Sequence, residues 1–306
     1  MTPDHISRAW WRLRFEVEFR RSKGQGFEDL VQRILEHRFP DEYKPVKAAG
    51  SIGDKKCDGL LTEQRLLVAC YGPEGWNKDK ATAKIASDFG GAQQHWADDF
   101  DTWAFAHNDT AGAPPYVHES LKAITNSADH SKVAEEWGYA RLRDLVFELT
   151  HEQLTELLGP PVTLADILSV EIADIAPLLK AVEDATANPL AEVEPVPVDK
   201  LERNDFSEWA IELLQLGRRR SPAVGTYFEN LKTRPLFRDD LGTRFTARYV
   251  GLRDDGRTPD EILGALIEWV AGSAPHPKTH GAALTVIAYF LDQCDIYETD
   301  AWEATS

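Results

Sequence analysis

Three carboxylates and a lysine near the start of the sequence could act together on a phosphodiester. Glu28 lies in a helical pattern, and Asp54 and Asp58 lie in the segment GDKKCDG, which leads into two short apolar runs. Carboxylate oxygens can hold Mg²⁺ against a phosphate, and a lysine can help to generate or position the attacking hydroxide. The candidate chemistry is therefore metal-dependent cleavage of a phosphodiester.

The second apolar run lacks two groups that this chemistry usually uses. It should end in an acidic or amide residue, one spacer and a lysine, but it ends in Ala69-Cys70-Tyr71. A site that generates hydroxide is thus incomplete by the ordinary pattern. Lys84, on the next expected helix, could reach back and supply the missing charge if it were placed accurately.

Each carboxylate also has a structural interpretation. Glu28 fits an exposed helix carboxylate, and Asp58 before Gly59 fits a turn residue that bonds its own backbone. The order of the segments GFE, GD and DG along the chain is more specific than any one residue. We therefore favour a core derived from a nuclease.

His107 and two cysteines are weaker candidates. His107-Asn108 ends an apolar run and could face the same cleft, but a histidine with a structural role is the alternative. Cys57 and Cys70 are interpreted as core residues, because no His and acid are visibly arranged to activate a thiol.

The elements that must position these residues follow an α/β pattern. Apolar residues recur at helical spacing in GFEDLVQRILEHRF, and KCDGLLTEQRLLVACYG indicates two strands joined by the polar turn TEQR. A helix over 80–96, a strand over 103–106 and a helix over 141–158 follow. We predict an α/β domain over residues 1–159, with a mixed sheet flanked by helices.

The remaining sequence is helical. Residues 160–200 are interpreted as a helix over 164–182 followed by a linker, because 185–198 contain three prolines and little periodicity. Residues 201–306 are predicted to form an all-α domain, with helices over 205–216, 224–231, 236–252, 259–271 and 282–293.

Charge and composition restrict the class of protein. The 306 residues carry a formal net charge of −17, which argues against a general basic field for nucleic acid. Any such contact is expected to be local, at Lys23, Lys55, Lys56 and Lys78, with solvated surface lysines as the alternative. No apolar run is long enough for a signal peptide or a membrane span, and three cysteines are too few for a disulfide framework. We expect a soluble cytoplasmic protein.

The first half of the chain resembles a bacterial family with a restriction-endonuclease-like, PD-(D/E)XK N-terminal domain. The resemblance runs to about Gly159 and rests on EFRRSKGQGFEDL, GSIGDKKCDGLL, ACYGPE, KIASDFGGAQQHW, WAFAHND and EEWGYARLRDLVFELT. It implies Glu28 and Asp58 as metal ligands, Asp54 as an auxiliary carboxylate, and Mg²⁺ as the cofactor of an active site. The family usually carries Gln in place of Ala69, so this chain departs from it there.

The last third resembles the C-terminal helical domain of antiphage systems with three components organised around an ABC-type, SMC-like ATPase. The segments are VGTYFENL, FTARYVGL, PDEILGALIEW and AALTVIAYFLDQCDIYE. The resemblance implies an assembly domain, and the many apolar positions exceed what a short domain needs to bury. We expect self-association or docking to the ATPase through residues after Leu201, with Tyr289, Phe290, Ile296 and Tyr297 at or beside the contact.

Two functions follow from these observations. The first is a subunit of an antiphage defence complex that has a nuclease-like domain with an incomplete motif and a C-terminal domain for oligomerisation or docking. The second is an active metal-dependent DNA endonuclease in the same kind of system, with Glu28, Asp58 and Lys84 as its catalytic residues. A small-molecule hydrolase that uses His107 is the weakest alternative, because no nucleophile accompanies the histidine.

Overall fold

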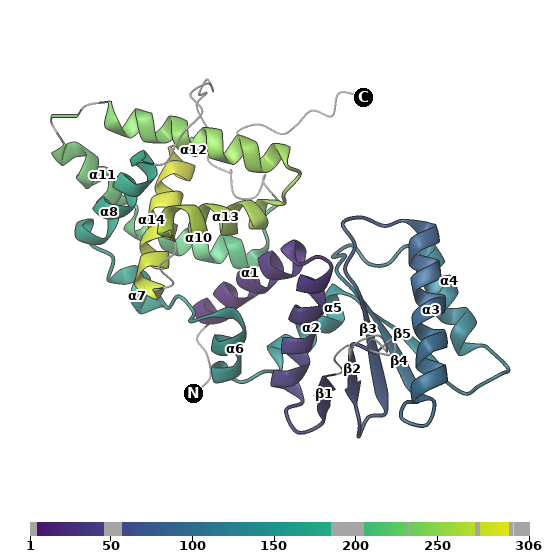
Figure 1. Ribbon diagram of the computed structural model, residues 1–306. Helices are drawn as coiled ribbons and strands as arrows, with labels where there is room; N and C mark the ends of the chain where they lie inside the picture. The colour runs from purple at the N-terminus through teal and green to yellow at the C-terminus, as the bar shows by residue number, and fades with distance from the viewer. Residues whose placement is uncertain are drawn as a thin grey trace. The chain divides into compact units, whose positions relative to one another are not determined.

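The chain forms two compact units in the computed structural model (Figure 1). The sheet unit consists of residues 18–157, and the helical unit consists of residues 1–17 and 158–306. The structure describes residues 5–45, 57–184, 205–231, 233–234, 236–272, 276–293 and 296. The predicted linker over 185–198 and the candidate residues Asp54, Lys55, Lys56 and Tyr297 lie outside the described residues.

The sheet unit is built on a five-stranded mixed sheet with the order β1-β2-β3-β4-β5. The first two pairs are antiparallel and the last two are parallel. The strands are β1 Tyr43–Pro45, β2 Gly59–Leu61, β3 Leu66–Tyr71, β4 Thr102–His107 and β5 Val133–Trp137. The expected hairpin is therefore present as β2 and β3, with Asp58 directly before its first strand.

Helices cover both faces of this sheet, which confirms the expected α/β class. Helices α2 and α5 lie on one face, and α3 and α4 lie on the other (Figure 1). Buried residues of β3 and β4 pack against α3 and α4 in one apolar core that includes Leu67, Ala69, Trp103, Phe105, Ile85 and Phe89. The helices of this part of the chain are α2 Gln25–Arg38, α3 Lys78–Trp96, α4 Pro115–Thr125, α5 Tyr139–Phe147 and α6 His151–Leu158.

The predicted helix over 141–158 is two helices, and the local cause is a cap. The backbone N–H of Thr150 donates to Gln153 Oε1 at 2.9 Å, and the backbone N–H of Gln153 contacts Thr150 Oγ1 at 3.3 Å. This reciprocal pair forms a capping box that starts a new helix. The predicted helix over 164–182 is likewise split, into α7 Leu164–Leu168 and α8 Ile172–Asp184.

The structure also contains elements that the sequence patterns did not predict, namely β1, α4, β5 and α1 His5–Arg21. In α1, residues such as Trp10, Trp11 and Phe15 are buried on several sides of the helix. A helix that is covered all round shows no single apolar stripe, so its periodicity is hard to recognise.

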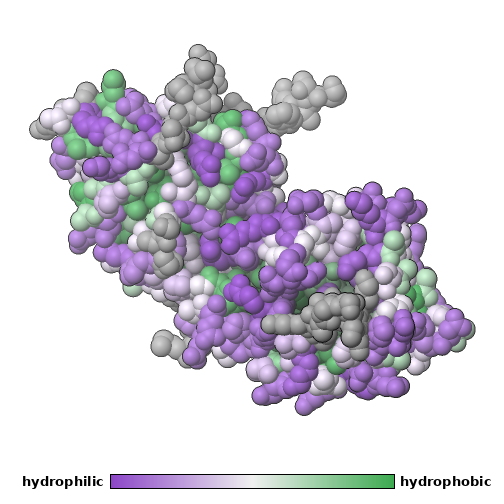
Figure 2. Space-filling model, viewed as in Figure 1, coloured by the Kyte–Doolittle hydropathy of each residue, from purple (hydrophilic) through white to green (hydrophobic). Residues whose placement is uncertain are grey.

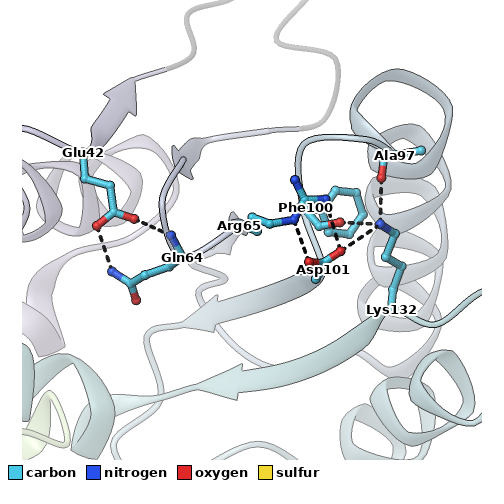
Figure 3. A network of polar contacts seen from close by, with 7 residues as sticks. All are labelled: Glu42, Gln64, Arg65, Ala97, Phe100, Asp101 and Lys132. Atoms are coloured by element: carbon cyan, nitrogen blue, oxygen red, sulfur yellow. Dashed lines mark hydrogen bonds and ion pairs between the residues drawn. The ribbon is translucent and has the colours of Figure 1, made fainter.

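A polar network fixes the turn between β2 and β3 to the starts of β4 and β5 (Figure 3). Arg65 has a left-handed backbone, with φ of 50°. Its guanidinium binds Asp101 through Nε at 2.6 Å and Nη2 at 3.2 Å. Lys132 Nζ lies 3.6 Å from Asp101 and donates to the carbonyls of Ala97 and Phe100. The network thus links the hairpin turn to the segments that lead into β4 and β5, while backbone pairing sets the register of the strands.

The helical unit surrounds a buried central helix, α14. This helix spans Pro277–Asp292, and all its residues from Gly281 to Ala288 are buried. Its neighbours are α7, α8, α10 Glu208–Arg220, α11 Pro222–Asn230 and α13 Pro259–Ala271, and α12 Phe237–Asp254 packs on α8 and α13. No helix in the described part of the chain is long and apolar enough to cross a membrane.

Most of the apolar residues expected to form a contact surface are buried inside this unit instead, although Tyr227, Phe228 and Tyr289 keep part of their surface. Ile262, Leu266, Val286 and Phe245 are each at most 2% exposed. Figure 2 shows hydrophilic side chains over most of the visible face, with apolar ones gathered near α8 and α14. The core therefore accounts for most of the apolar residues in these helices, and self-association stays a prediction.

We predict that Gly217→Ala destabilises the helical unit by about 1–3 kcal/mol, the usual cost of overfilling a tight contact. A Cβ at Gly217 of α10 would lie 2.7 Å from the carbonyl oxygen of Leu284 in α14. Gly251→Ala is the matched control, because its Cβ would meet nothing within 4 Å. That change should stabilise α12 by up to about 1 kcal/mol. Urea unfolding measures both, and equal effects of the two changes would contradict the close contact.

We also predict that the helical unit loses stability as pH falls from about 6.5. Burial, together with the charge of Arg14, lowers the pKa of His280 to about 4. Between these values the unfolded chain binds a proton that the folded chain does not, so the free energy of unfolding decreases with falling pH. His280→Asn should flatten this dependence in urea titrations, whereas the exposed control His95→Asn should keep it. A His280 variant with the wild-type pH profile would refute the prediction.

Candidate functional site

Glu28, Asp58 and Lys84 come from three elements, and the charges of the two carboxylates act on Lys84. Glu28 lies in the first turn of α2, Asp58 precedes β2 and Lys84 lies in α3, and each is half-buried. All three charges affect the pKa of the Cys70 thiol in β3. Burial raises the pKa of Cys70, Asp58 and Glu28 raise it further, and Lys84 opposes them. The thiol is therefore held protonated at neutral pH, which supports a core role for Cys70.

Asp58 is fixed by the neighbouring strand rather than by its own turn. Its Oδ2 accepts a hydrogen bond from the backbone N–H of Cys70 at 2.6 Å, and its own N–H donates to Val68 O at 3.0 Å. The hydroxyl of Tyr43 donates to the Asp58 carbonyl at 3.2 Å. A Cβ at Gly59 would lie 2.4 Å from the Tyr43 ring, so this approach requires glycine.

Lys84 remains charged although it is partly removed from water. Burial lowers its pKa, but the hydrogen bond and charge of Asp88 and the charges of Asp58 and Glu28 outweigh burial and raise it overall. Its Nζ lies 2.5 Å from Asp88 Oδ2. The lysine thus supplies a permanent cation to the same region as the two carboxylates.

The end of β3 carries an aromatic ring where a metal-dependent nuclease would carry its lysine. Tyr71 stacks on Phe105 at 5.9 Å between ring centroids and lies 5.8 Å from Trp76. Burial raises the pKa of Tyr71, and the charge of Lys84 opposes this effect. The charge of Lys84 therefore acts on the strand end that lacks a lysine of its own.

His107 is a buried residue with both ring nitrogens engaged. Its Nε2 lies 2.6 Å from Glu136 Oε1, and its Nδ1 accepts from the backbone N–H of Asp109 at 3.2 Å. Burial lowers the pKa of His107, against the raising effect of Glu136. Asn108 is buried too and donates to the carbonyl of Ser22 at 2.9 Å. These contacts support a structural role for both residues.

No sequence motif indicates the contact between His107 and Glu136. Glu136 lies in β5, which the sequence patterns did not predict, and only the parallel pairing of β4 with β5 brings it beside His107. A Cβ at Gly138 would lie 2.5 Å from Glu136 Oε1 and 3.0 Å from the His107 ring. A glycine directly after an edge strand is therefore the one sequence feature that could have indicated this contact.

The metal set stays a prediction. Among the described residues, no three His, Cys, Asp or Glu side chains are grouped so that they could hold a metal ion. Asp54, the third predicted ligand, lies outside those residues. Mg²⁺ commonly uses one or two carboxylates and takes its other ligands from water and substrate phosphates. Glu28 and Asp58 are compatible with that mode of binding.

The proposed nucleic-acid and partner residues occupy different environments. Lys78 is exposed at the start of α3, and Lys23 is half-buried before α2. In the helical unit, Phe290 is fully buried and stacks on Phe245 at 4.2 Å, and Ile296 is 1% exposed. Tyr289 keeps part of its surface, 5.7 Å from Phe228. Phe290 and Ile296 can therefore influence a partner contact only through the fold of the unit.

Residues 173–298 match the family model of C-terminal domain 10 of the ABC-three component (ABC-3C) systems. The matched region includes α8 and α10 to α14, together with the segment interpreted as a linker. The comparisons with curated proteins and with solved structures give no match. The expected similarity of the helical region to an ABC-3C C-terminal domain is thus confirmed, and the nuclease-like character of the sheet unit stays a prediction.

We predict that Asp58→Ala destabilises the sheet unit by about 1–3 kcal/mol, because the buried N–H of Cys70 loses its charged acceptor. Asp58→Asn should cost less, since an amide oxygen can still accept that bond. Asp79→Ala at an exposed position is the control and should change stability by less than about 0.5 kcal/mol. Urea unfolding gives the three values. An Asp58→Ala chain as stable as the wild type would show that this bond is dispensable.

Proposed function

We propose that the chain is a subunit of an ABC three-component antiphage defence system. Its helical region docks the subunit to an ABC-type ATPase or to a second copy, and its sheet unit is a PD-(D/E)XK nuclease-like domain with an incomplete motif. The observation that carries this proposal is the match of residues 173–298 to an ABC-3C C-terminal domain. A domain found at the end of components of such systems is suited to a shared task, which is assembly.

The surface around Tyr289 is the best candidate for the docking contact. Tyr289 borders the aromatic cluster of Phe228, Phe237 and Phe290, and it keeps exposed surface at the edge of the core. Leu236, beside Phe237, is 67% exposed. Large apolar side chains at the edge of a rigid core lose little conformational entropy when a partner buries them. We name Tyr289 and Leu236 the docking pair.

The nuclease-like assignment is supported by the charges that converge on Cys70. Glu28 and Asp58 would hold Mg²⁺, which supplies charge neutralisation at the scissile phosphate and activation of water when it is bound. Lys84 would neutralise a second phosphate oxygen, and Lys23 and Lys78 would contact the DNA backbone locally. The sheet unit is therefore suited to meet a phosphodiester, with or without cleaving it.

An active endonuclease is the second candidate function. It is favoured by the charged state of Lys84 in the region of Glu28 and Asp58. It is disfavoured by Ala69 and Tyr71, which replace the strand residues that usually complete the metal site and position hydroxide. We therefore rank binding and assembly above cleavage.

The docking role predicts that the full chain purifies with an ABC-type ATPase of the same system. Tyr289→Ser combined with Leu236→Ser should weaken the complex at least tenfold, because burial of one large apolar side chain contributes about 1.5–3 kcal/mol. Leu168→Ser removes another apolar side chain, 47% exposed in the same unit, and should leave binding unchanged. Calorimetry measures the affinities. Equal binding by the docking-pair variant would place the contact elsewhere, and the absence of any complex would remove the assembly role.

The incomplete motif predicts no cleavage of plasmid DNA by the isolated chain with Mg²⁺ or Mn²⁺. The same assay with the neighbouring components decides between the two functions. Cleavage that Glu28→Gln and Asp58→Asn abolish, but Asp79→Asn does not, would establish the endonuclease and displace our first choice. DNA binding without cleavage under all these conditions would support the nuclease-like binding domain.

A further inference from the structure

Asp88 is a buried carboxylate that the nuclease-like motif does not include. The residue lies one turn after Lys84 in α3 and is 1% exposed. In an ordinary ion pair on a helix surface, by contrast, both charged side chains are exposed to water. Its Oδ2 is 2.5 Å from Lys84 Nζ, and the Lys84 side chain is 33% exposed. The carboxylate is thus inside the unit while the ammonium reaches its surface.

Support for the helix alone does not explain this pair. Removing a carboxylate from water is costly unless a cation and further hydrogen bonds compensate for it. The order Lys84 then Asp88 is also the less favourable one for a pair four residues apart, since an acidic residue that precedes a basic one suits the helix dipole better. Asp88 is surrounded in sequence by the core residues Ile85, Phe89 and Ala92, and an apolar side chain would suit that environment.

The position of Lys84 gives the pair a role in the site. The charge of Lys84 acts on Cys70 and Tyr71 of β3, and the charges of Glu28 and Asp58 act on Lys84. A lysine stem has several rotatable bonds and would otherwise sample many positions in water. An anchor on the buried side therefore determines where the ammonium is presented.

We propose that Asp88 is a positioning residue that holds the Lys84 ammonium at the surface of the sheet unit, where the ammonium binds a phosphate oxygen of a phosphodiester. The binding part of this inference rests on the proposed function. The part that concerns how Asp88 holds Lys84 rests on the 2.5 Å contact between their side chains and on the burial of Asp88, and it can be tested without any nucleic acid.

The first test measures how fast each lysine of α3 reacts with an amine-selective acylating reagent, with mass spectrometry of the digested chain as the readout. In the wild type, Lys84 should react more slowly than the exposed Lys78 and Lys80 of the same helix. This measurement needs no variant, so it remains informative if a substitution prevents folding. Equal reactivity of the three lysines would overturn the inference.

The second test uses Asp88→Asn, with Asp79→Asn on the exposed side of α3 as the matched control. Loss of the carboxylate removes the hydrogen bond and the charge that oppose burial most strongly, and only the charges of Asp58 and Glu28 still raise the pKa of Lys84. The pKa of Lys84 therefore falls, and each unit of decrease raises the reactive, unprotonated fraction about tenfold. The variant should therefore label Lys84 several-fold faster and the control should not. Asp88→Glu keeps the charge and should restore slow labelling. Unchanged Lys84 labelling in a folded Asp88→Asn chain would overturn the holding role.

The third test measures binding of a short single-stranded DNA by fluorescence anisotropy. Asp88→Asn and Lys84→Met should each weaken binding several-fold, and the double variant should bind no more weakly than Lys84→Met, because both changes remove one shared interaction. Additive losses would overturn positioning through Lys84. If the wild type binds no DNA while Lys84 labelling responds to Asp88→Asn, the holding role is supported, and the phosphodiester role fails together with the nuclease-like assignment.

Discussion

The parallel pairing of β3 with β4 is the constraint on which the sheet unit depends. Antiparallel strands can be joined by a tight turn, as β2 and β3 are, but parallel strands need a crossover on one face of the sheet. That crossover is α3. The register of the β3–β4 pairing places Tyr71 beside His107 at the ends of the two strands. Because α3 carries Lys84 and Asp88, the same pairing delivers a cation to the strand whose own lysine is missing.

Three buried or half-buried polar side chains of this unit each have a close partner. Lys84 is held by Asp88, His107 lies against Glu136, and the Asp58 carboxylate accepts from a backbone N–H. In a protein with a net charge of −17, any contact with a phosphate is expected to need such local positive charge. Lys84 supplies a positive charge in this unit, and the charges of Glu28 and Asp58 act on it, which supports the phosphodiester contact that we propose.

The helical unit shows how a high apolar content can be misleading as an indicator of assembly. Its central helix α14 is covered by its neighbours, and α10 approaches so closely that Gly217 lies against the backbone of Leu284. Burial on all sides of one helix consumes many apolar residues within a small volume. The case for docking therefore depends on the match to an ABC-3C domain and on exposed residues at the edge of the core, such as Leu236, rather than on composition.

The sequence by itself determined the elements whose signals are local. The periodicity of α2, the apolar runs of β2 and β3, the stop at Gly159 and the helices of the last third could all be read from residues close together in the chain. It also determined that the strand end Ala69-Cys70-Tyr71 lacks the usual acidic or amide residue and the lysine.

Only the tertiary structure decided which distant residues meet. Asp58 binding the N–H of Cys70, Glu136 binding His107 and the short edge strand β5 depend on strand pairing. The same holds for burial. Phe290 and Ile296 are as apolar as residues that anchor a partner at the surface, but the packing of the helical unit places them inside. Sequence periodicity describes one helix at a time, whereas burial depends on every helix around it.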